Sequence, residues 1–477
     1  MMYFHKLLWA ALICFPFSPG FAAPRESPPE SVEKVLSAYK MPTESLSLFV
    51  QDVNEDTPLL AVNMGVPRNP ASTIKLLTTF IALEGLGPTY QWKTDAFLGG
   101  EVTDGLLDGD LYLKGYGDPY MVIERFWLLL KKMQQRGVRN IAGDLVIDNS
   151  YFEVEKIDPG DFDGQAYRTY NVVPDAFLVN FQAIDFMFRP DSTGDGVEII
   201  ADPMPANLEV RNELRLTGGY CGGFQNGISV SISDAVQLDR VTFAGTYRRD
   251  CLEYHLSRTV LQAPTFAYGV FKSTWEKMGG VLQGALRVGR VPETLDSFVS
   301  VASPPLSEVI RSINKWSNNV MARHLLLTLG AERFGPPATV EKGRRAAMML
   351  LAEQGLDFPE LRIDNGAGLS RKTRISAGNL GRALLAANSS IYSAEFISSL
   401  PLAGLDGTLR RRFQDEGLTG RMHLKTGRLT GVFAMAGYLR AQSGREYVVV
   451  AIQNHSDAHR GPGEEAQSEF LRWVYQQ

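Results

Sequence analysis

The hydrophobic pattern predicts regular structure soon after the start of the chain. Residues 31–40 carry apolar side chains at helical spacing among charged ones, which predicts a short amphipathic helix. Residues 45–53 and 58–64 are apolar runs rich in strand-forming residues, separated by turn-forming ones, and predict a pair of strands.

A second helical pattern follows Pro70. Its apolar positions recur at i, i+1, i+4 and i+5, and a Gly/Pro cluster at 85–88 stops it. We therefore expect a helix whose apolar stripe packs into a core. Ser72 and Lys75 are three residues apart at its first turn, so their side chains are expected on one face. The apolar stripe consists of Leu76, Leu77, Phe80 and Ile81.

The pattern changes between about residues 95 and 290. Short β-like runs alternate there with Gly, Asp, Pro and Asn, which predicts β-rich modules. We interpret 96–290 as inserted between two parts of one catalytic domain, 23–95 and 291–477. Helices followed by strands in the second part predict an α+β fold with an antiparallel sheet flanked by helices. The predicted helices there are 306–329, 340–354 and 464–475, and the predicted strands are 421–429, 431–439 and 446–454.

Composition limits the class of protein. The chain has 477 residues, of which 44% are hydrophobic and 21% charged, which is typical of a globular protein with more than one domain. Its formal net charge of −5 argues against nucleic-acid binding.

The first 22 residues predict a signal peptide. A basic start is followed by an apolar run from Leu7 to Phe17, too short to span a bilayer, and then by small residues. We expect cleavage after Ala22, which removes one Lys and changes the charge from −5 to −6. No later segment is apolar enough to span a membrane, so we expect an exported, periplasmic protein. In an oxidising compartment Cys221 and Cys251 suggest one disulfide, and two unpaired buried thiols are the alternative.

Three short motifs limit the chemistry. Of four S-x-x-K matches only Ser72–Lys75 opens an apolar helix; an S-x-N follows at Ser317–Asn319, and the single K-T-G is Lys425–Gly427. In this order the three motifs are the parts of a serine acyl-transfer site for penicillin-like and D-alanyl peptides.

Each residue type suits that chemistry. The Ser72 hydroxyl is a weak nucleophile until a base takes its proton, and Lys75 can do so only when neutral. Burial and a second cation, Lys425, would both lower the pKa of Lys75. Ser317 can relay a proton to the leaving amine, and Asn319 can hold Lys75 and a substrate carbonyl. The alternative for residues 316–319 is a helix N-cap.

The K-T-G segment suits a substrate-binding strand. Lys425 and Thr426 can bind a terminal carboxylate, and Gly427 lets a substrate strand approach the backbone. Residues 408–428 hold six basic and two acidic residues, a net of 6 − 2 = +4, which would attract an anion. A solubilising face is the alternative, above all for the run 410–412. The six histidines form no H-E-x-x-H motif, and we expect neither a metal nor another cofactor.

With these motifs the chain resembles the exported D-alanyl-D-alanine carboxypeptidase/endopeptidase family, the low-molecular-mass class C penicillin-binding proteins. The resemblance runs from about residue 30 to the end. Further segments that carry it are 113–119, 143–145, 170–176, 364–371 and 400–409.

The resemblance implies a penicillin-recognising serine transpeptidase-like fold with two accessory domains, one nested within the other, in the long interval between Ser72 and Ser317. It implies that Ser72 is acylated with Lys75 as its base. It also implies that the N–H groups of Ser72 and Arg428 form the oxyanion hole. Family members usually have Thr or Ser where this chain has Arg428, so the hydroxyl contact to the substrate carboxylate is absent here.

We therefore expect a serine DD-carboxypeptidase/DD-endopeptidase that cleaves peptidoglycan stem peptides and cross-links, with beta-lactams as covalent inhibitors. One alternative is a beta-lactamase, although the chain has no Glu-x-x-x-Asn element in a suitable place. Another is a non-catalytic wall-binding protein with the same fold. The protein could act as a monomer or as a homodimer, and the sequence does not distinguish the two.

Overall fold

The computed structural model describes residues 23–222, 227–233, 239–414 and 417–477. The predicted signal peptide, residues 1–22, lies outside the described residues. Within the described ranges no helix is both long enough and apolar enough to cross a membrane.

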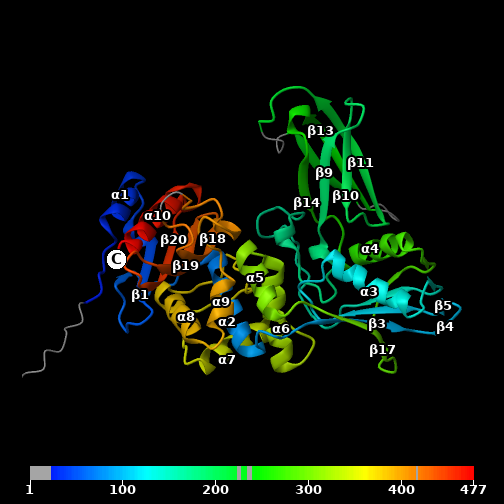
Figure 1. Cartoon of the computed structure of the whole chain (residues 1–477), viewed down its shortest axis with the longest axis horizontal. Coiled ribbons are helices and arrows are strands. Elements are labelled where there is room, and N and C mark those ends of the chain that lie inside the picture. Colours follow the sequence, from blue (N-terminus) through cyan, green and yellow to red (C-terminus); the bar gives the residue numbers. More distant parts are fainter. Residues whose placement is uncertain (1–22, 223–226, 234–238, 415–416) are drawn as a thin grey trace, which may run out of the picture.

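A five-stranded antiparallel sheet organises one half of the molecule, drawn with helices on both of its faces in Figure 1. It combines strands from both ends of the chain because the first strand pairs along its whole length with the last. The strands are buried on both faces, which explains their continuous apolar runs. In spatial order they are β18 (Met422–Leu429), β19 (Val432–Arg440), β20 (Glu446–Asn454), β1 (Leu46–Asp52) and β2 (Leu60–Val62).

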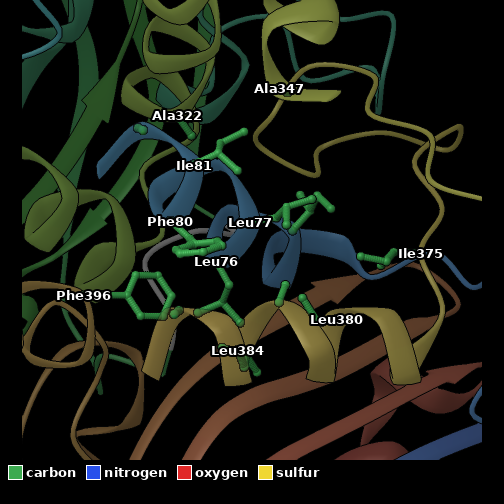
Figure 2. Packing of buried hydrophobic residues seen from close by; sticks show 14 of the residues in the cluster. Leu76, Leu77, Phe80, Ile81, Ala322, Ala347, Ile375, Leu380, Leu384 and Phe396 are labelled. Carbon is green, nitrogen blue, oxygen red and sulfur yellow. The ribbon is translucent and has the colours of Figure 1, made fainter. Parts of the chain in front are cut away.

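Helix α2 (Ile74–Leu86) lies at the centre of the larger core, on one face of this sheet. Figure 2 shows Leu76, Leu77 and Phe80 pointing from α2 toward neighbouring elements. Phe80 meets Phe396 edge-on, with ring centroids 6.1 Å apart. The predicted apolar stripe is thus confirmed as a core face. The other helices on this side are α5 (Leu306–Trp316), α6 (Asn319–Phe334), α7 (Val340–Glu353), α8 (Ala377–Ser389) and α9 (Ser393–Ser398).

The opposite face of the sheet is covered by α1 (Glu30–Ala38) and α10 (Pro462–Tyr475). Both were predicted, within two residues at each end. Apolar residues of β1 alternate between the two cores: Leu48 packs toward α1 and α10, and Phe49 packs toward α2. This alternation gives a three-layer arrangement of helix, sheet and helix.

The prediction of one helical pattern over 306–329 is wrong in one respect, because the chain forms two helices there. Ser317 has a left-handed backbone (φ 58°) that ends α5, and the Asn318 side chain accepts a hydrogen bond from the N–H of Met321 and caps α6. The apolar periodicity continues across the break and conceals it. The N-cap alternative is therefore confirmed for Asn318.

The inserted region is rich in β-structure, as predicted, and it also contains two helices that the sequence did not predict. The beginning and the end of the inserted region form a five-stranded and a four-stranded sheet. These sheets pack with α3 (Ile123–Gln135) and α4 (Ala263–Lys277). The five-stranded sheet contains β16 (Leu286–Val288), β8 (Leu145–Asp148), β6 (Leu111–Gly115), β3 (Lys93–Leu98) and β17 (Ser297–Ala302). The four-stranded sheet contains β15 (Val281–Leu282), β7 (Asn140–Ile141), β5 (Leu106–Asp108) and β4 (Glu101–Thr103).

A smaller β-module is formed by residues 184–258, and it stands apart at one end of the molecule (Figure 1). The Cys221–Cys251 disulfide lies in this module, which confirms the predicted bridge. One sheet has β10 (Val197–Asp202), β9 (Ile184–Pro190) and β14 (Tyr254–Arg258), and the other has β11 (Leu208–Thr217), β13 (Asp239–Arg248) and β12 (Ile228–Ser233).

The division of the chain into domains stays a prediction, but the sheet pairings move its boundaries. Strands β3 and β17 pair with each other and belong to the inserted five-stranded sheet. A boundary at 95/96 would cut β3, and one at 290/291 would detach β17. We therefore propose that the insertion begins near residue 93 and ends near residue 302.

Close packing of α6 and α7 gives a stability prediction. A Cβ atom added at Gly330 would lie 2.6 Å from the backbone nitrogen of Gly343. We expect Gly330→Ala to lower the free energy of unfolding by about 2 kcal/mol, since the helices must separate, although alanine favours a helix. Gly65→Ala is the control because no atom lies within 4 Å of its added Cβ. Denaturant unfolding of both variants checks this, and equal stabilities would contradict it.

Candidate active site

Lys75 lies at the centre of the site, in the first turn of α2. Its Nζ donates to Ser72 Oγ at 3.0 Å, to Asn319 Oδ1 at 2.7 Å and to the carbonyl oxygen of Ala367 at 2.5 Å. Ser72 itself lies in a single 3₁₀ turn, Ala71–Thr73, that leads into α2. Three stretches far apart in sequence thus meet at one amine.

The charge state of Lys75 follows from its surroundings. The residue is fully buried, and among the described residues no carboxylate pairs with it. Burial lowers the pKa of Lys75 well below its usual value, and the charges of Lys425 and Arg323 lower it further. The neutral amine is therefore favoured. It keeps two N–H donors, for Asn319 and Ala367, and its lone pair can accept the proton of the Ser72 hydroxyl.

Lys425 approaches the same space from β18. Its Nζ donates to Ser317 Oγ at 2.8 Å and to the carbonyl oxygen of Thr426 at 2.7 Å. Burial lowers the pKa of Lys425 to about 7. The left-handed conformation of Ser317 directs its hydroxyl to this amine, so the helix break found in the fold is also part of the site.

Strand β18 packs directly against the turn that carries Ser72. A Cβ atom added at Gly427 would lie 2.7 Å from the carbonyl oxygen of Pro70 and 3.0 Å from the Ser72 nitrogen. A larger residue would therefore push β18 away from the serine. Strand β18 lies at the edge of the sheet, and residues 401–403 pair with the beginning of its outer row, at Met422 and Leu424. Beyond Leu424 no strand of the described chain pairs with that row. Arg428, next along β18, has an exposed side chain.

The predicted basic patch is smaller than its sequence suggests. Arg410 and Arg411 are exposed, and Thr426 Oγ1 donates to Thr408 Oγ1 at 2.9 Å beside them. Arg412 is half-buried and pairs with Glu464 at 3.1 Å, so it does not contribute an open charge. Asp415 and Glu416, counted in the predicted patch, lie outside the described residues.

The insertion reaches the site through backbone carbonyl groups. Asn319 Nδ2 donates to the Tyr170 carbonyl oxygen at 3.3 Å, and Arg323 Nη1 donates to the Val172 carbonyl oxygen at 2.9 Å. Asn319 and Arg323 are one turn apart on α6. Two contacts therefore fasten residues 170–172 to the helix that holds Lys75 in place.

A cavity of about 930 Å³ opens beside this junction, between the insertion and the loop 364–372. The insertion contributes acidic side chains to its lining, and the loop and helices contribute basic ones together with the acidic Glu341 and Asp364. Arg371 connects the two sides, since its guanidinium lies 4.9 Å from the ring centroid of Phe162. The acidic residues include Glu153, Glu155, Asp158 and Asp161; the basic ones are Arg323, Arg344, Arg371 and Lys372.

The sequence predicted the side chains of the site and missed its backbone partners. Ser72, Lys75, Ser317, Asn319 and Lys425 converge, with Thr426, Gly427 and Arg428 on the adjoining strand. The carbonyl groups of Ala367 and Tyr170 and the charge of Arg323 were not predicted. Ala367 and Tyr170 fall within segments that carry the family resemblance, which is the one signal that marks them. Over the described ranges no group of three or more His, Cys, Asp or Glu residues could hold a metal ion.

The sequence is similar to those of known proteins over most of its length. The model of the D-Ala-D-Ala carboxypeptidase 3 (S13) family matches residues 29–474. The chain is 26% identical over 455 residues to a D-alanyl-D-alanine carboxypeptidase of Actinomadura sp. (strain R39), covering 91% of this chain and 81% of that protein. It is 24% identical over 420 residues to the D-alanyl-D-alanine carboxypeptidase DacB of Haemophilus influenzae, covering 87% and 86%.

Solved structures agree on the fold. Penicillin binding protein 4 of Haemophilus influenzae superposes with a TM-score of 0.79 at 22% identity, covering 94% of this chain and 99% of that chain. The predatory peptidoglycan endopeptidase Bd3459 of Bdellovibrio bacteriovorus has a TM-score of 0.52 at 15% identity, covering 90% of each chain. The predicted penicillin-binding protein fold is thus confirmed.

The backbone of Ser317 gives a prediction about strain in the site. We compare Ser317→Gly with Ser317→Ala, because both remove the hydroxyl and only glycine adopts φ 58° without steric cost. The glycine variant should be more stable than the alanine variant by about 1 kcal/mol. Thermal and denaturant unfolding measure the difference, and an alanine variant of equal or greater stability would contradict the assignment of strain.

Proposed function

The chain belongs to the D-Ala-D-Ala carboxypeptidase 3 (S13) family, and from this premise we propose that it is an exported serine DD-carboxypeptidase and DD-endopeptidase. Its substrates would be peptidoglycan stem peptides that end in D-Ala-D-Ala and the cross-links made from them. The observation that carries the proposal is a buried lysine, Lys75, whose Nζ lies 3.0 Å from the hydroxyl oxygen of Ser72 and which has no carboxylate partner in the part of the chain that the structure describes.

Acylation follows from this geometry. Ser72 Oγ attacks the carbonyl carbon of the penultimate D-Ala, and its proton passes to Lys75 Nζ. The backbone N–H groups of Ser72 and Arg428 would donate to the oxyanion of the tetrahedral intermediate, and the close approach of Gly427 to the Ser72 nitrogen supports this pairing. The Asn319 amide, which binds Lys75 through Oδ1, would hold the substrate through Nδ2.

Departure of the terminal D-Ala uses Ser317 and Lys425. When the C–N bond breaks, the leaving amine takes a proton through Ser317 from Lys425, and the hydrogen bond between these two residues supports the relay. Lys425, Thr426 and Arg428 would hold the terminal carboxylate. Before the second step, the proton that Lys75 took from Ser72 passes through Ser317 to Lys425, which restores both lysines. Water then attacks the ester and gives a proton to Lys75, and Lys75 returns it to Ser72 Oγ as the ester bond breaks and the shortened peptide leaves.

Endopeptidase cleavage would use the same steps with a different leaving amine, one that belongs to a second stem peptide. The fold of the endopeptidase Bd3459 supports this part of the proposal only as a likeness of fold. The Cys221–Cys251 disulfide supports export, because disulfides persist in oxidising compartments.

Penicillin labelling tests the nucleophile. A beta-lactam should acylate Ser72, so a fluorescent penicillin should label the protein and Ser72→Ala should abolish the label. Ser31→Ala is the matched control, since Ser31 begins another S-x-x-K sequence in α1, where Lys34 pairs with Glu30 instead. Labelling that persists in Ser72→Ala would refute the assignment. Rapid turnover of a chromogenic cephalosporin would favour a beta-lactamase.

The pH dependence tests the two lysines. The mechanism needs Lys75 neutral and Lys425 protonated. The rate at which a D-Ala-D-Ala peptide is hydrolysed should therefore rise with pH as Lys75 loses its proton. It should fall as the pH passes through about 7, where Lys425 loses its own proton. Arg323→Gln removes a charge that lowers the pKa of Lys75, so the rising limb should move to higher pH.

Pre-steady-state acylation between pH 5 and 9 measures both limbs of this profile. Arg345→Gln, on the exposed side of α7, should leave both in place. A rising limb that stays fixed in Arg323→Gln, or moves to lower pH, would contradict the role given to Lys75.

A further inference from the structure

An ion pair joins the end of α5 to the turn formed by residues 401–409. Lys315, two residues before Ser317, lies in the last turn of α5, and its Nζ binds Asp406 Oδ2 at 2.5 Å. The Lys315 side chain is only 7% exposed, so its ammonium group needs a compensating anion. Neither residue of this pair takes part in the chemical steps proposed above.

Asp406 also holds the 401–409 turn in shape. Its second carboxylate oxygen, Oδ1, accepts a hydrogen bond from the N–H of Leu402 at 2.7 Å. Burial alone would raise the pKa of Asp406, but its hydrogen bonds with Lys315 and Leu402 keep that pKa below its usual value. The ionised carboxylate therefore binds α5 through one oxygen and the turn through the other.

The same turn contacts both elements that meet at the second lysine of the site. The N–H of Leu424 on β18 donates to the carbonyl oxygen of Pro401 at 3.0 Å. On the side of α5, a Cβ atom added at Gly407 would lie 2.6 Å from the carbonyl oxygen of Lys315. The turn is thus packed against the last turn of α5 and paired with the beginning of β18.

These contacts bear on how Ser317 meets Lys425. Ser317 directly follows α5, Lys425 directly follows Leu424 on β18, and the hydrogen bond of 2.8 Å between them joins the two elements. Because α5 and β18 are also joined through the turn, a loss of the Asp406 ion pair should loosen this hydrogen bond. The bonds of Lys75 to its three partners involve none of these groups.

We propose that Asp406 is a positioning residue for the proton relay from Lys425 through Ser317 to the leaving amine, and that it acts through its ion pair with Lys315. This inference rests on the proposed function. It assigns Asp406 to the departure of the amine and not to the attack of Ser72, because the pair supports the relay and makes no bond to Lys75.

Two substrates with different leaving groups test this role. One is a peptide that ends in D-Ala-D-Ala, whose leaving amine must take a proton as the C–N bond breaks. The other has a thioester in place of the scissile amide, and its thiolate leaves without a proton. General acid catalysis contributes about 10²–10⁴-fold, so Ser317→Ala should lower kcat/KM for the amide by about 100-fold and for the thioester far less.

Asp406→Asn removes the charge and keeps an acceptor for the N–H of Leu402. It should lower kcat/KM for the amide by about tenfold and leave that for the thioester within about twofold. Lys315→Met should show the same selective loss, and the double variant should lose no more than either single variant, because both changes break one interaction. A merely structural role would lower both activities together.

Two further variants sharpen the comparison. Lys315→Arg keeps the charge and should retain more amide hydrolysis than Lys315→Met. Glu353→Gln breaks the exposed ion pair of Glu353 with Arg333, between α7 and α6, and should leave both activities unchanged. If Asp406→Asn does not fold, Lys315→Met decides in its place. Equal losses on the two substrates in the folded variants, or no loss on the amide, would overturn the inference.

Failure of the proposed function would look different. The unaltered protein would then cleave neither substrate, or Ser317→Ala would lose both activities equally, and the relay itself would be wrong. A selective loss in Ser317→Ala without one in Asp406→Asn would leave the relay in place and refute only the role of Asp406.

Discussion

A lysine amine buried without a counter-ion is the constraint on which the rest of the site depends. Taking an ammonium group out of water costs several kcal/mol, so the protein favours the neutral amine at Lys75. That amine still needs hydrogen-bond partners, and the chain supplies them from Ser72, Asn319 and Ala367. The same burial that favours the neutral amine thus requires three distant segments to converge, and in the proposed mechanism it links the base to the tertiary fold.

The insertion takes part in that convergence although it has its own hydrophobic core. Its residues 170–172 offer two carbonyl groups to α6, at Asn319 and at Arg323. Arg323 also contributes positive charge near Lys75, which favours the neutral amine. In the proposed mechanism, an accessory region attached in this way influences the reaction without contributing a side chain to the serine, because it fixes the helix whose Asn319 binds Lys75.

The sequence predicted what depends on local pattern and on side-chain identity. The apolar stripe of α2, the strands around Lys425 and the pairing of Ser72 with Lys75 all follow from spacing. It did not predict the break at Ser317, because the apolar periodicity continues through it, and it missed α3 and α4 within a region dominated by turn residues. Carbonyl oxygens such as those of Ala367 and Tyr170 leave no trace in composition, since every residue has one. The solvated Arg412 expected from its run of charges proved to be paired, because α10 brings Glu464 beside it.

The backbone around the serine departs from what its residues prefer locally. Ala71 and Ser317 both have positive φ, at 46° and 58°, where glycine would be less strained. Ser317 must carry a hydroxyl to Lys425, so glycine cannot replace it without loss of that contact. Ala71 is held between Gly427 and Gly368, and both of these neighbours lack the Cβ atom that would collide with the turn. The two glycines thus lie opposite Ala71, and the close approach that they permit holds the serine turn in place against its local preference.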